Sequence, residues 1–254
     1  MTVLETRALS KRFGGVHAVR DVSFSVTAGE MLALIGPNGA GKSTCFNLVN
    51  GQLAADHGEV VLCGKAITGR LPREIFRLGV GRTFQIPACF ASMPVIESVQ
   101  AALISRDRMT FRFWRPATAY NLAEALELVN AIGMGTQTDR NCGVLAYGDI
   151  KRVELALALA NQPRLLLMDE PTAGMAPGER RALMGLTQAI ARQRGIAVLF
   201  TEHDMDAVFE FADRIIVMDR GEVIAEGAPA AIRRNAKVQD VYLGSGAMFG
   251  AARD

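Results

Sequence analysis

The sequence predicts an α/β fold with a parallel sheet at its core, an additional antiparallel β region and an inserted helical segment. Three observations support this. Residues 31–35, MLALI, form a continuous apolar run of strand length, as expected for a strand buried on both faces. From residue 164 onward, apolar strand-like runs alternate with helical patterns. Between about residues 86 and 160 the character changes, and helical patterns dominate.

Composition indicates a well-packed globular protein. Of 254 residues, 50% are apolar and 21% are charged, and Lys plus Arg (28) nearly balances Asp plus Glu (26). That balance gives no reason to expect a nucleic-acid partner. Mean hydropathy is +0.18, but the apolar runs fall short of the about 20 residues that a bilayer span needs. The N-terminus lacks the charged-then-apolar order of a signal peptide, so a cytoplasmic location is expected.

The cysteines and histidines give no metal-site pattern. Cys45, Cys63, Cys89 and Cys142 lie far apart without a CxxC pair, and there are only three histidines. We expect the cysteines to be small, partly buried side chains in a reducing compartment.

The first part of the chain is predicted to be mainly β structure. VRDVSFSV (19–26) alternates apolar and polar residues, and a turn follows at 27–30. After MLALI, the pattern becomes helical from Lys42 to Val49. GEVVLCGKAI is then expected to form a strand pair with Gly64 and Lys65 at its turn.

Three helices are predicted in the inserted segment. They are VIESVQAALIS, which starts after Pro94, then NLAEALELVNAIG and KRVELALALA. Strands RLLLMD and IAVLFT follow on either side of a helix at 178–195, and RIIVMD and EVIAEG form a hairpin around Arg220 and Gly221. The predicted organisation is a core of about 1–85 and 161–254 with a helical subdomain of about 86–160.

A phosphate-binding loop follows the buried MLALI strand. It fits G-x-x-x-x-G-K-[ST] at every fixed position, and with the next residue it comprises Gly36, Pro37, Asn38, Gly39, Ala40, Gly41, Lys42, Ser43 and Thr44. Glycines let backbone N–H groups surround an anion, and the following helix points its positive end at the same place. Lys42 is expected to neutralise the β- and γ-phosphates and Ser43 to hold Mg²⁺. The core is therefore predicted to be a P-loop NTPase (RecA-like) domain that binds ATP and Mg²⁺.

Two acidic residues end the strand RLLLMD. A buried parallel strand delivers side chains at its C-terminal end to the ligand crevice. Asp169 is expected to bind the magnesium ion, and Glu170 to polarise the attacking water.

The segment 145–152, LAYGDIKR, resembles the LSGGQ signature of ABC ATPases. It lies between the P-loop and the acidic strand, as in that family. The resemblance implies that the signature of one subunit contacts the γ-phosphate held by another, through a glycine and a helix N-terminus. The residues concerned are Ala146, Tyr147, Gly148 and Asp149.

Three further residues fall in the order that the family shows, so their roles are implied by the resemblance. Phe13 matches the aromatic residue that stacks on adenine. Gln85 matches the glutamine that senses magnesium and water and links to the membrane partner. His203 matches the switch histidine that contacts the γ-phosphate.

The chain also departs from the family pattern. Ala146, Tyr147 and Asp149 replace the serine, a glycine and the glutamine of the signature, and Ala176 stands where many ABC proteins have Asp. Losing the serine hydroxyl removes one neutral hydrogen bond, worth about 1 kcal/mol. Losing the carboxylate at position 176 affects a loop that couples the subunits. Lys42, Glu170 and His203 are retained, so an active ATPase is expected.

Several details resemble the ATPases of branched-chain amino-acid importers. They are RTFQ, the LAYGD form of the signature, AGMAP after the acids, and a tail with an amphipathic helix ending in Tyr242-Leu243-Gly244. The resemblance implies two membrane permeases, a second ABC ATPase subunit (identical or related), a periplasmic solute-binding protein, and a peripheral position on the inner face of the cell membrane. Related systems carry urea, short amides or other amino acids.

Two other functions remain open from the sequence. A lipopolysaccharide-export ATPase has similar length and motif order, and a non-transport ABC ATPase such as an iron–sulfur assembly scaffold would look alike. Long coiled coils and a second module are both missing, which argues against a DNA-repair clamp and a translation-type ABC protein. The stretch 111–116, FRFWRP, mixes aromatic and basic residues and suits either a permease or lipid contact or an anchored loop.

Overall fold

The computed structural model describes residues 1–83, 90–108 and 120–244. Within these ranges the larger sheet has the strand order β10-β9-β3-β8-β7-β6, parallel from β9 to β6, with β10 antiparallel at the edge. Its strands are β3 (Met31–Ile35), β6 (Val80–Thr83), β7 (Leu165–Asp169), β8 (Ala197–Thr201), β9 (Arg214–Asp219) and β10 (Glu222–Gly227). The predicted parallel core is confirmed.

The second sheet is antiparallel, with the order β2-β1-β4-β5. Its strands are β1 (Thr2–Phe13), β2 (Val16–Thr27), β4 (His57–Leu62) and β5 (Lys65–Ala66). The predicted strand pair is present, but its turn is formed by Cys63 and Gly64, both at positive φ, one residue earlier than expected.

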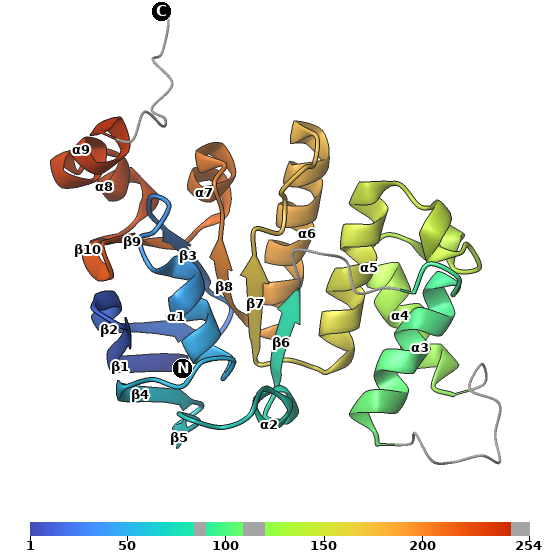
Figure 1. Ribbon diagram of the computed structural model, residues 1–254. Coiled ribbons are helices and arrows are strands. Elements are labelled where there is room, and N and C mark those ends of the chain that lie inside the picture. The colour runs from blue at the N-terminus through green and yellow to red at the C-terminus, as the bar shows by residue number, and fades with distance from the viewer. Residues whose placement is uncertain (84–89, 109–119, 245–254) are drawn as a thin grey trace, which may run out of the picture.

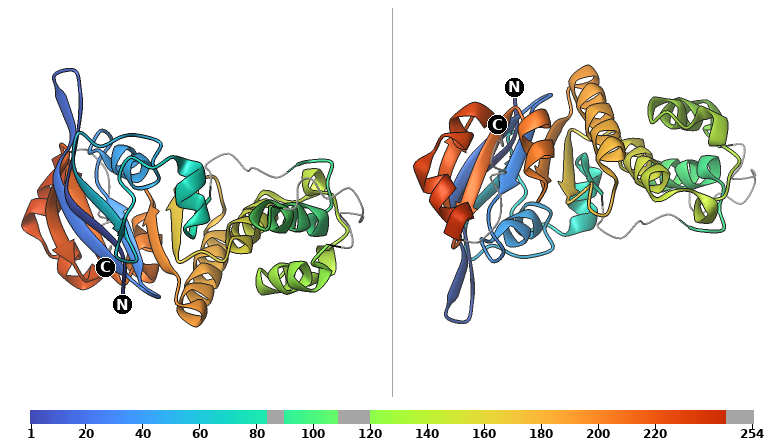
Figure 2. Two further views of the ribbon diagram at one scale, coloured as in Figure 1. Left: turned by 90° about the horizontal axis from the view of Figure 1, so that it is seen from below. Right: turned by 90° about the horizontal axis from the view of Figure 1, so that it is seen from above.

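The helices fall into two groups in space. Around the sheets lie α1 (Lys42–Val49), α2 (Pro72–Arg77), α6 (Pro177–Arg194), α7 (Met205–Phe211), α8 (Pro229–Arg233) and α9 (Ala236–Gly244). Beyond β6, at the opposite end of the molecule from β1 and β2, lie α3 (Val95–Arg106), α4 (Leu122–Ala131) and much of α5 (Tyr147–Ala160), as Figures 1 and 2 show. Helix α5 contacts both α3 and α6 and so joins the two groups.

Alternate residues of β3 supply two separate hydrophobic clusters. Met31, Ala33 and Ile35 belong to the cluster that includes the buried faces of α3, α4, α5 and α6. Leu32 and Leu34 belong to the cluster that includes α1 and the antiparallel sheet. Since successive side chains of a strand point to opposite faces, a strand covered on both sides must be apolar throughout. MLALI satisfies that requirement and carries the P-loop at its end.

Besides the turn at Cys63 and Gly64, the structure differs from the predicted elements at three places. Strand β6 was not predicted, because it is short and contains Gly81 and Arg82. Helix α2 was not predicted either. The predicted third helix begins four residues earlier than expected, at Tyr147, so Tyr147, Gly148 and Asp149 of the signature lie in the first turn of α5. The tail forms two short helices, α8 and α9, where one was expected.

Over the described ranges, every helix is too short or too polar to cross a bilayer. The FRFWRP stretch lies outside the described residues, so its predicted contact stays a prediction.

Candidate functional site

The loop between β3 and α1 passes between two backbone carbonyls. A Cβ at Gly36 would lie 2.2 Å from the carbonyl oxygen of Met218, and one at Gly41 would lie 2.2 Å from that of Ala18. Both glycines have positive φ, 152° and 100°. Only a residue without a side chain fits these two positions, so the glycines of the motif are required by close backbone approach.

Lys42 begins α1 and is only 8% exposed. Its Nζ donates hydrogen bonds to the carbonyl oxygens of Gly36 (2.6 Å) and Pro37 (3.0 Å), which holds the ammonium group against the loop. Burial lowers the pKa of Lys42, and the negative charges of Glu170 and Asp169 oppose that shift. The site thus places a cation at a helix N-terminus, an arrangement suited to phosphate.

The two acidic residues lie at the C-terminal end of β7, beside Thr201 at the end of β8. Thr201 Oγ1 donates to Asp169 Oδ1 (2.8 Å) and accepts from the backbone N–H of Glu170 (3.2 Å). Glu170 has φ of +48°, in the left-handed region that non-glycine residues seldom adopt. Such an outlier at the end of a central strand points to a functional position.

Glu170 and His203 are in contact. His203 Nε2 lies 2.8 Å from Glu170 Oε1. An ionised carboxylate only accepts hydrogen bonds, so this bond requires the proton on Nε2. The structure therefore brings together two residues that are 33 positions apart in the sequence.

The buried carboxylate of Glu202, which was not predicted, helps to hold the Glu170–His203 pair in place. Glu202 is 5% exposed, and its Oε1 accepts from the backbone N–H (2.8 Å) and the hydroxyl (2.6 Å) of Thr172. Its Oε2 accepts from the backbone N–H of His203 (3.2 Å). Glu202 thereby ties the loop after Glu170 to the residue that carries the imidazole.

A cavity of about 430 Å³ lies over the P-loop. It is lined by Val16, His17, Ala18, Asn38, Gly39, Ala40, Gly41, Lys42, Ser43, Thr44, Glu170, His203 and Arg220. Of these, Val16, His17, Ala18 and Arg220 were not predicted. Phe13 is 48% exposed at the end of β1 and is not among the described lining residues. Its ring lies 5.7 Å from Nζ of Lys11, so its proposed adenine contact stays a prediction.

The residues present fit a magnesium ion bound together with phosphates. The ion typically takes one or two carboxylates and keeps phosphate and water ligands. Ser43, exposed in the first turn of α1, and Asp169 would supply the protein ligands. Over the described part of the chain, His, Cys, Asp and Glu form no cluster of three or more that could hold a metal without such a ligand. Gln85 lies outside the described residues.

The signature residues do not line this cavity. Ala146 caps α5, Tyr147 and Asp149 are in its first turn, and Gly148 is buried against Glu179, whose Oε1 would be 3.0 Å from an added Cβ. Figures 1 and 2 place α1 and α5 on opposite sides of β7. Within one molecule the signature residues therefore lie away from the cavity over the P-loop.

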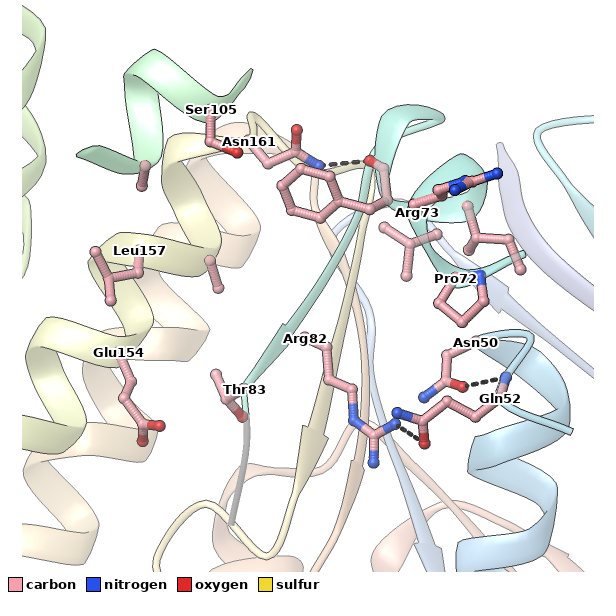
Figure 3. Close-up of a pocket in the computed structure, with 15 residues that line it drawn as sticks. Asn50, Gln52, Pro72, Arg73, Arg82, Thr83, Ser105, Glu154, Leu157 and Asn161 are labelled. Carbon is pink, nitrogen blue, oxygen red and sulfur yellow. Dashed lines mark hydrogen bonds between the residues drawn. The ribbon is translucent and has the colours of Figure 1, made fainter. Parts of the chain in front are cut away.

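Arg82, on β6, connects the carboxylates to a groove. Its Nη2 lies 3.5 Å from Asp169 Oδ2, and its Nη1 donates to Gln52 Oε1 (2.9 Å) and Asn47 Oδ1 (3.3 Å). The groove, of about 530 Å³, has α3 and α5 on one side and α2 and the end of α1 on the other (Figure 3). The sequence placed Arg82 in the RTFQ motif, but its long-range contacts were not foreseeable from the motif.

Two polar groups in this groove are buried without a hydrogen-bond partner among the described residues. They are Nδ2 of Asn50 and Oγ1 of Thr83, on residues that are each 6% exposed. A buried polar atom without a partner costs about 1–3 kcal/mol. This cost would be relieved if a bound segment supplied hydrogen-bonding groups.

Comparison with known proteins adds family information. A family profile described as "ABC transporter" matches residues 19–173, and one described as "Branched-chain amino acid ATP-binding cassette transporter" matches residues 222–247. The "High-affinity branched-chain amino acid transport ATP-binding protein BraF" of Pseudomonas aeruginosa is 35% identical over 249 residues, covering 95% of this chain and 98% of that protein.

Comparison with solved structures gives the same family. The ADP conformation of an ATP-binding cassette of an ABC transporter has a TM-score of 0.85 at 33% identity, covering 96% of this chain and 99% of that one. A dimeric ATP-binding cassette in a post-hydrolysis state, bound to ADP and Pi, has a TM-score of 0.73 at 25% identity, covering 89% and 98%.

The glycines of the loop provide a matched test. Gly39→Ala and Gly41→Ala both place a side chain at positive φ, but an added Cβ meets nothing within 4 Å at Gly39 and a carbonyl at 2.2 Å at Gly41. We expect Gly39→Ala to cost about 1 kcal/mol of unfolding free energy and Gly41→Ala at least about 2 kcal/mol more. Chemical denaturation measures both, and equal losses would contradict the close approach to Ala18.

Proposed function

Because this chain belongs to the ATP-binding cassettes of ABC transporters, a family that hydrolyses ATP to power transport, we propose that it drives an importer of branched-chain or related amino acids. The observation that carries the proposal is the similarity to branched-chain amino-acid transport ATPases over 95% of the chain. The separate match at residues 222–247 supports it at the C-terminal tail. Both favour import over the lipopolysaccharide-export and scaffold alternatives.

In this proposal the P-loop holds the phosphate chain. Backbone N–H groups within residues 36–44, where Pro37 has none, face the phosphate oxygens, and Lys42 exchanges its bonds to Gly36 and Pro37 for bonds to the β- and γ-phosphates. Ser43, Asp169 and Gln85 would hold Mg²⁺, which when bound neutralises charge on the two phosphates.

The carboxylate of Glu170 orients and deprotonates the attacking water. The water oxygen bonds to the γ-phosphorus while the bond from that phosphorus to the bridging oxygen breaks, leaving ADP and phosphate. On nucleotide binding His203, whose backbone N–H bonds to Glu202, would exchange the bond from its Nε2–H to Glu170 for one to the γ-phosphate. The strained backbone of Glu170 and its bond to Thr201 aim the carboxylate before the nucleotide binds.

Two protomers are proposed to enclose two nucleotides. Each would present Ala146, Tyr147, Gly148 and Asp149, at the start of α5, to the nucleotide on its partner's P-loop. The dimeric cassette with ADP and Pi supports this pairing by similarity. Backbone donors and the positive end of α5 suit the terminal phosphate.

The groove between α2 and α5 is proposed to receive a cytoplasmic segment of the permease. Among the described residues it has two buried polar atoms, on Asn50 and Thr83, without a hydrogen-bond partner, and it continues through Arg82 to Asp169. A segment seated there could thus sense the nucleotide site. The second ATPase subunit, the periplasmic solute-binding protein and a peripheral position at the inner membrane follow from the same proposal.

The first experiment replaces Glu170 with Gln. Gln keeps the shape but cannot act as a base, so ATP turnover should fall at least about 100-fold. ATP affinity should stay within about threefold, and the variant should accumulate as an ATP-bound dimer in size-exclusion chromatography. Thr187→Ala, a change in the buried face of α6 away from the cavity, controls for folding. Turnover near that of the unmodified protein would refute the role of Glu170.

The second experiment fills the groove. Ser105→Trp introduces a bulky ring at an exposed position that lines the groove, whereas Leu122→Trp alters an exposed position on α4 outside it. With the permeases co-expressed, Ser105→Trp should reduce permease recovery at least about fivefold without changing ATP affinity. Full recovery with Ser105→Trp would place the permease contact elsewhere.

A further inference from the structure

The turn between β9 and β10 is attached directly to the P-loop. The backbone N–H of Gly221 donates to the carbonyl oxygen of Ala40 (3.0 Å), and the carbonyl oxygen of Gly221 accepts from the N–H of Arg20 (2.8 Å). An added Cβ at Gly221, which has φ of +84°, would lie 2.9 Å from the carbonyl oxygen of His17. The turn therefore keeps a fixed position at the edge of the cavity.

Arg220 lies in this turn and lines the same cavity as Lys42. Its backbone has φ of +47°, and its side chain is 94% exposed. Over the described ranges its one oppositely charged neighbour within 4 Å is Asp219, the adjacent residue, with Nε and Oδ2 3.9 Å apart. At that distance no hydrogen bond forms, so the guanidinium is available to a ligand.

The cavity is lined by the cations Lys42 and Arg220 and by the carboxylate of Glu170, so its net charge favours an anion. Lys42 is held by two loop carbonyls at one place, while Arg220 stands on a different element that faces the same space. A guanidinium presents several N–H donors in a planar fork that matches phosphate oxygens. A triphosphate held on the P-loop would enter the cavity that Lys42 and Arg220 both line.

We propose that Arg220 is a nucleotide-binding residue whose guanidinium contacts the phosphate chain of ATP in this cavity. The inference rests on the proposed function, because it assumes that ATP occupies the P-loop. It adds a contact from the β9–β10 turn, an element that the sequence motifs leave out. Since Gly221 is bonded to Ala40, the same turn that carries the contact also supports the loop.

The test compares nucleotide affinity in the full-length protein by isothermal titration. Arg220→Ala and Arg220→Gln should each weaken ATP binding about fivefold, and Arg220→Lys should retain part of the affinity. Arg220→Glu should weaken it more than tenfold, because a carboxylate would repel the phosphates. If the contact is to phosphate, ATP and GTP should lose affinity by the same factor. A loss confined to ATP would overturn the phosphate assignment.

Arg20→Ala is the matched control. The Arg20 guanidinium bonds to Glu222 (2.8 Å) on β10, close to the same turn, but does not line the cavity. The affinity of the Arg20→Ala variant for ATP should stay within twofold of that of the unmodified protein. If Arg220→Ala and Arg220→Gln bind ATP with affinities within twofold of the unmodified protein while Lys42→Ala loses binding, the inference about Arg220 is overturned. The proposed function is then unaffected. Absence of ATP binding by the unmodified protein would instead refute the proposed function.

Discussion

The structure depends on the close passage of one loop between two backbone carbonyls. Gly36 lies against the carbonyl of Met218 and Gly41 against that of Ala18, with no space for a Cβ at either. This contact joins the parallel sheet, the antiparallel sheet and α1 at one point. It also turns the loop so that Lys42 begins the helix and folds back on Gly36 and Pro37. The backbone of the loop thus favours anion binding, and the proposed function assigns catalysis and communication to the side chains around it.

Three polar residues connect the acidic end of β7, beside this loop, to other parts of the molecule. Thr201 links Asp169 to the backbone of Glu170, and Glu202 links the next loop to His203. Arg82 continues from Asp169 to the groove beside α1 and α2. A displacement of the groove would therefore act on a residue proposed to hold the metal. The same chain of contacts would carry the presence of nucleotide back to a partner in the groove.

Local patterns predicted the parts of the site that are continuous in the sequence. The buried run MLALI, the P-loop glycines and the helix from Lys42 all lie within twenty residues of the sequence. The structure confirms each of them in its predicted position. The acids at 169 and 170 were predicted because they end an apolar run. Arg82, Glu202 and Arg220 were missed as candidate site residues, since each lies beside the site only through the packing of elements that are far apart in the sequence. The start of α5 was misplaced because Gly148 and Asp149 are poor helix formers, and packing of the helix against α3 and α6 outweighs that preference.

Hydrogen–deuterium exchange on addition of a non-hydrolysable ATP analogue with Mg²⁺ tests the central claim, that main-chain amides of two facing protomers grip the phosphates. The amides of residues 36–44 should become protected at all protein concentrations. Those of residues 146–149 should become protected only at concentrations where the protein dimerises. Unchanged exchange in the P-loop, or protection of residues 146–149 in a monomer, would contradict the account.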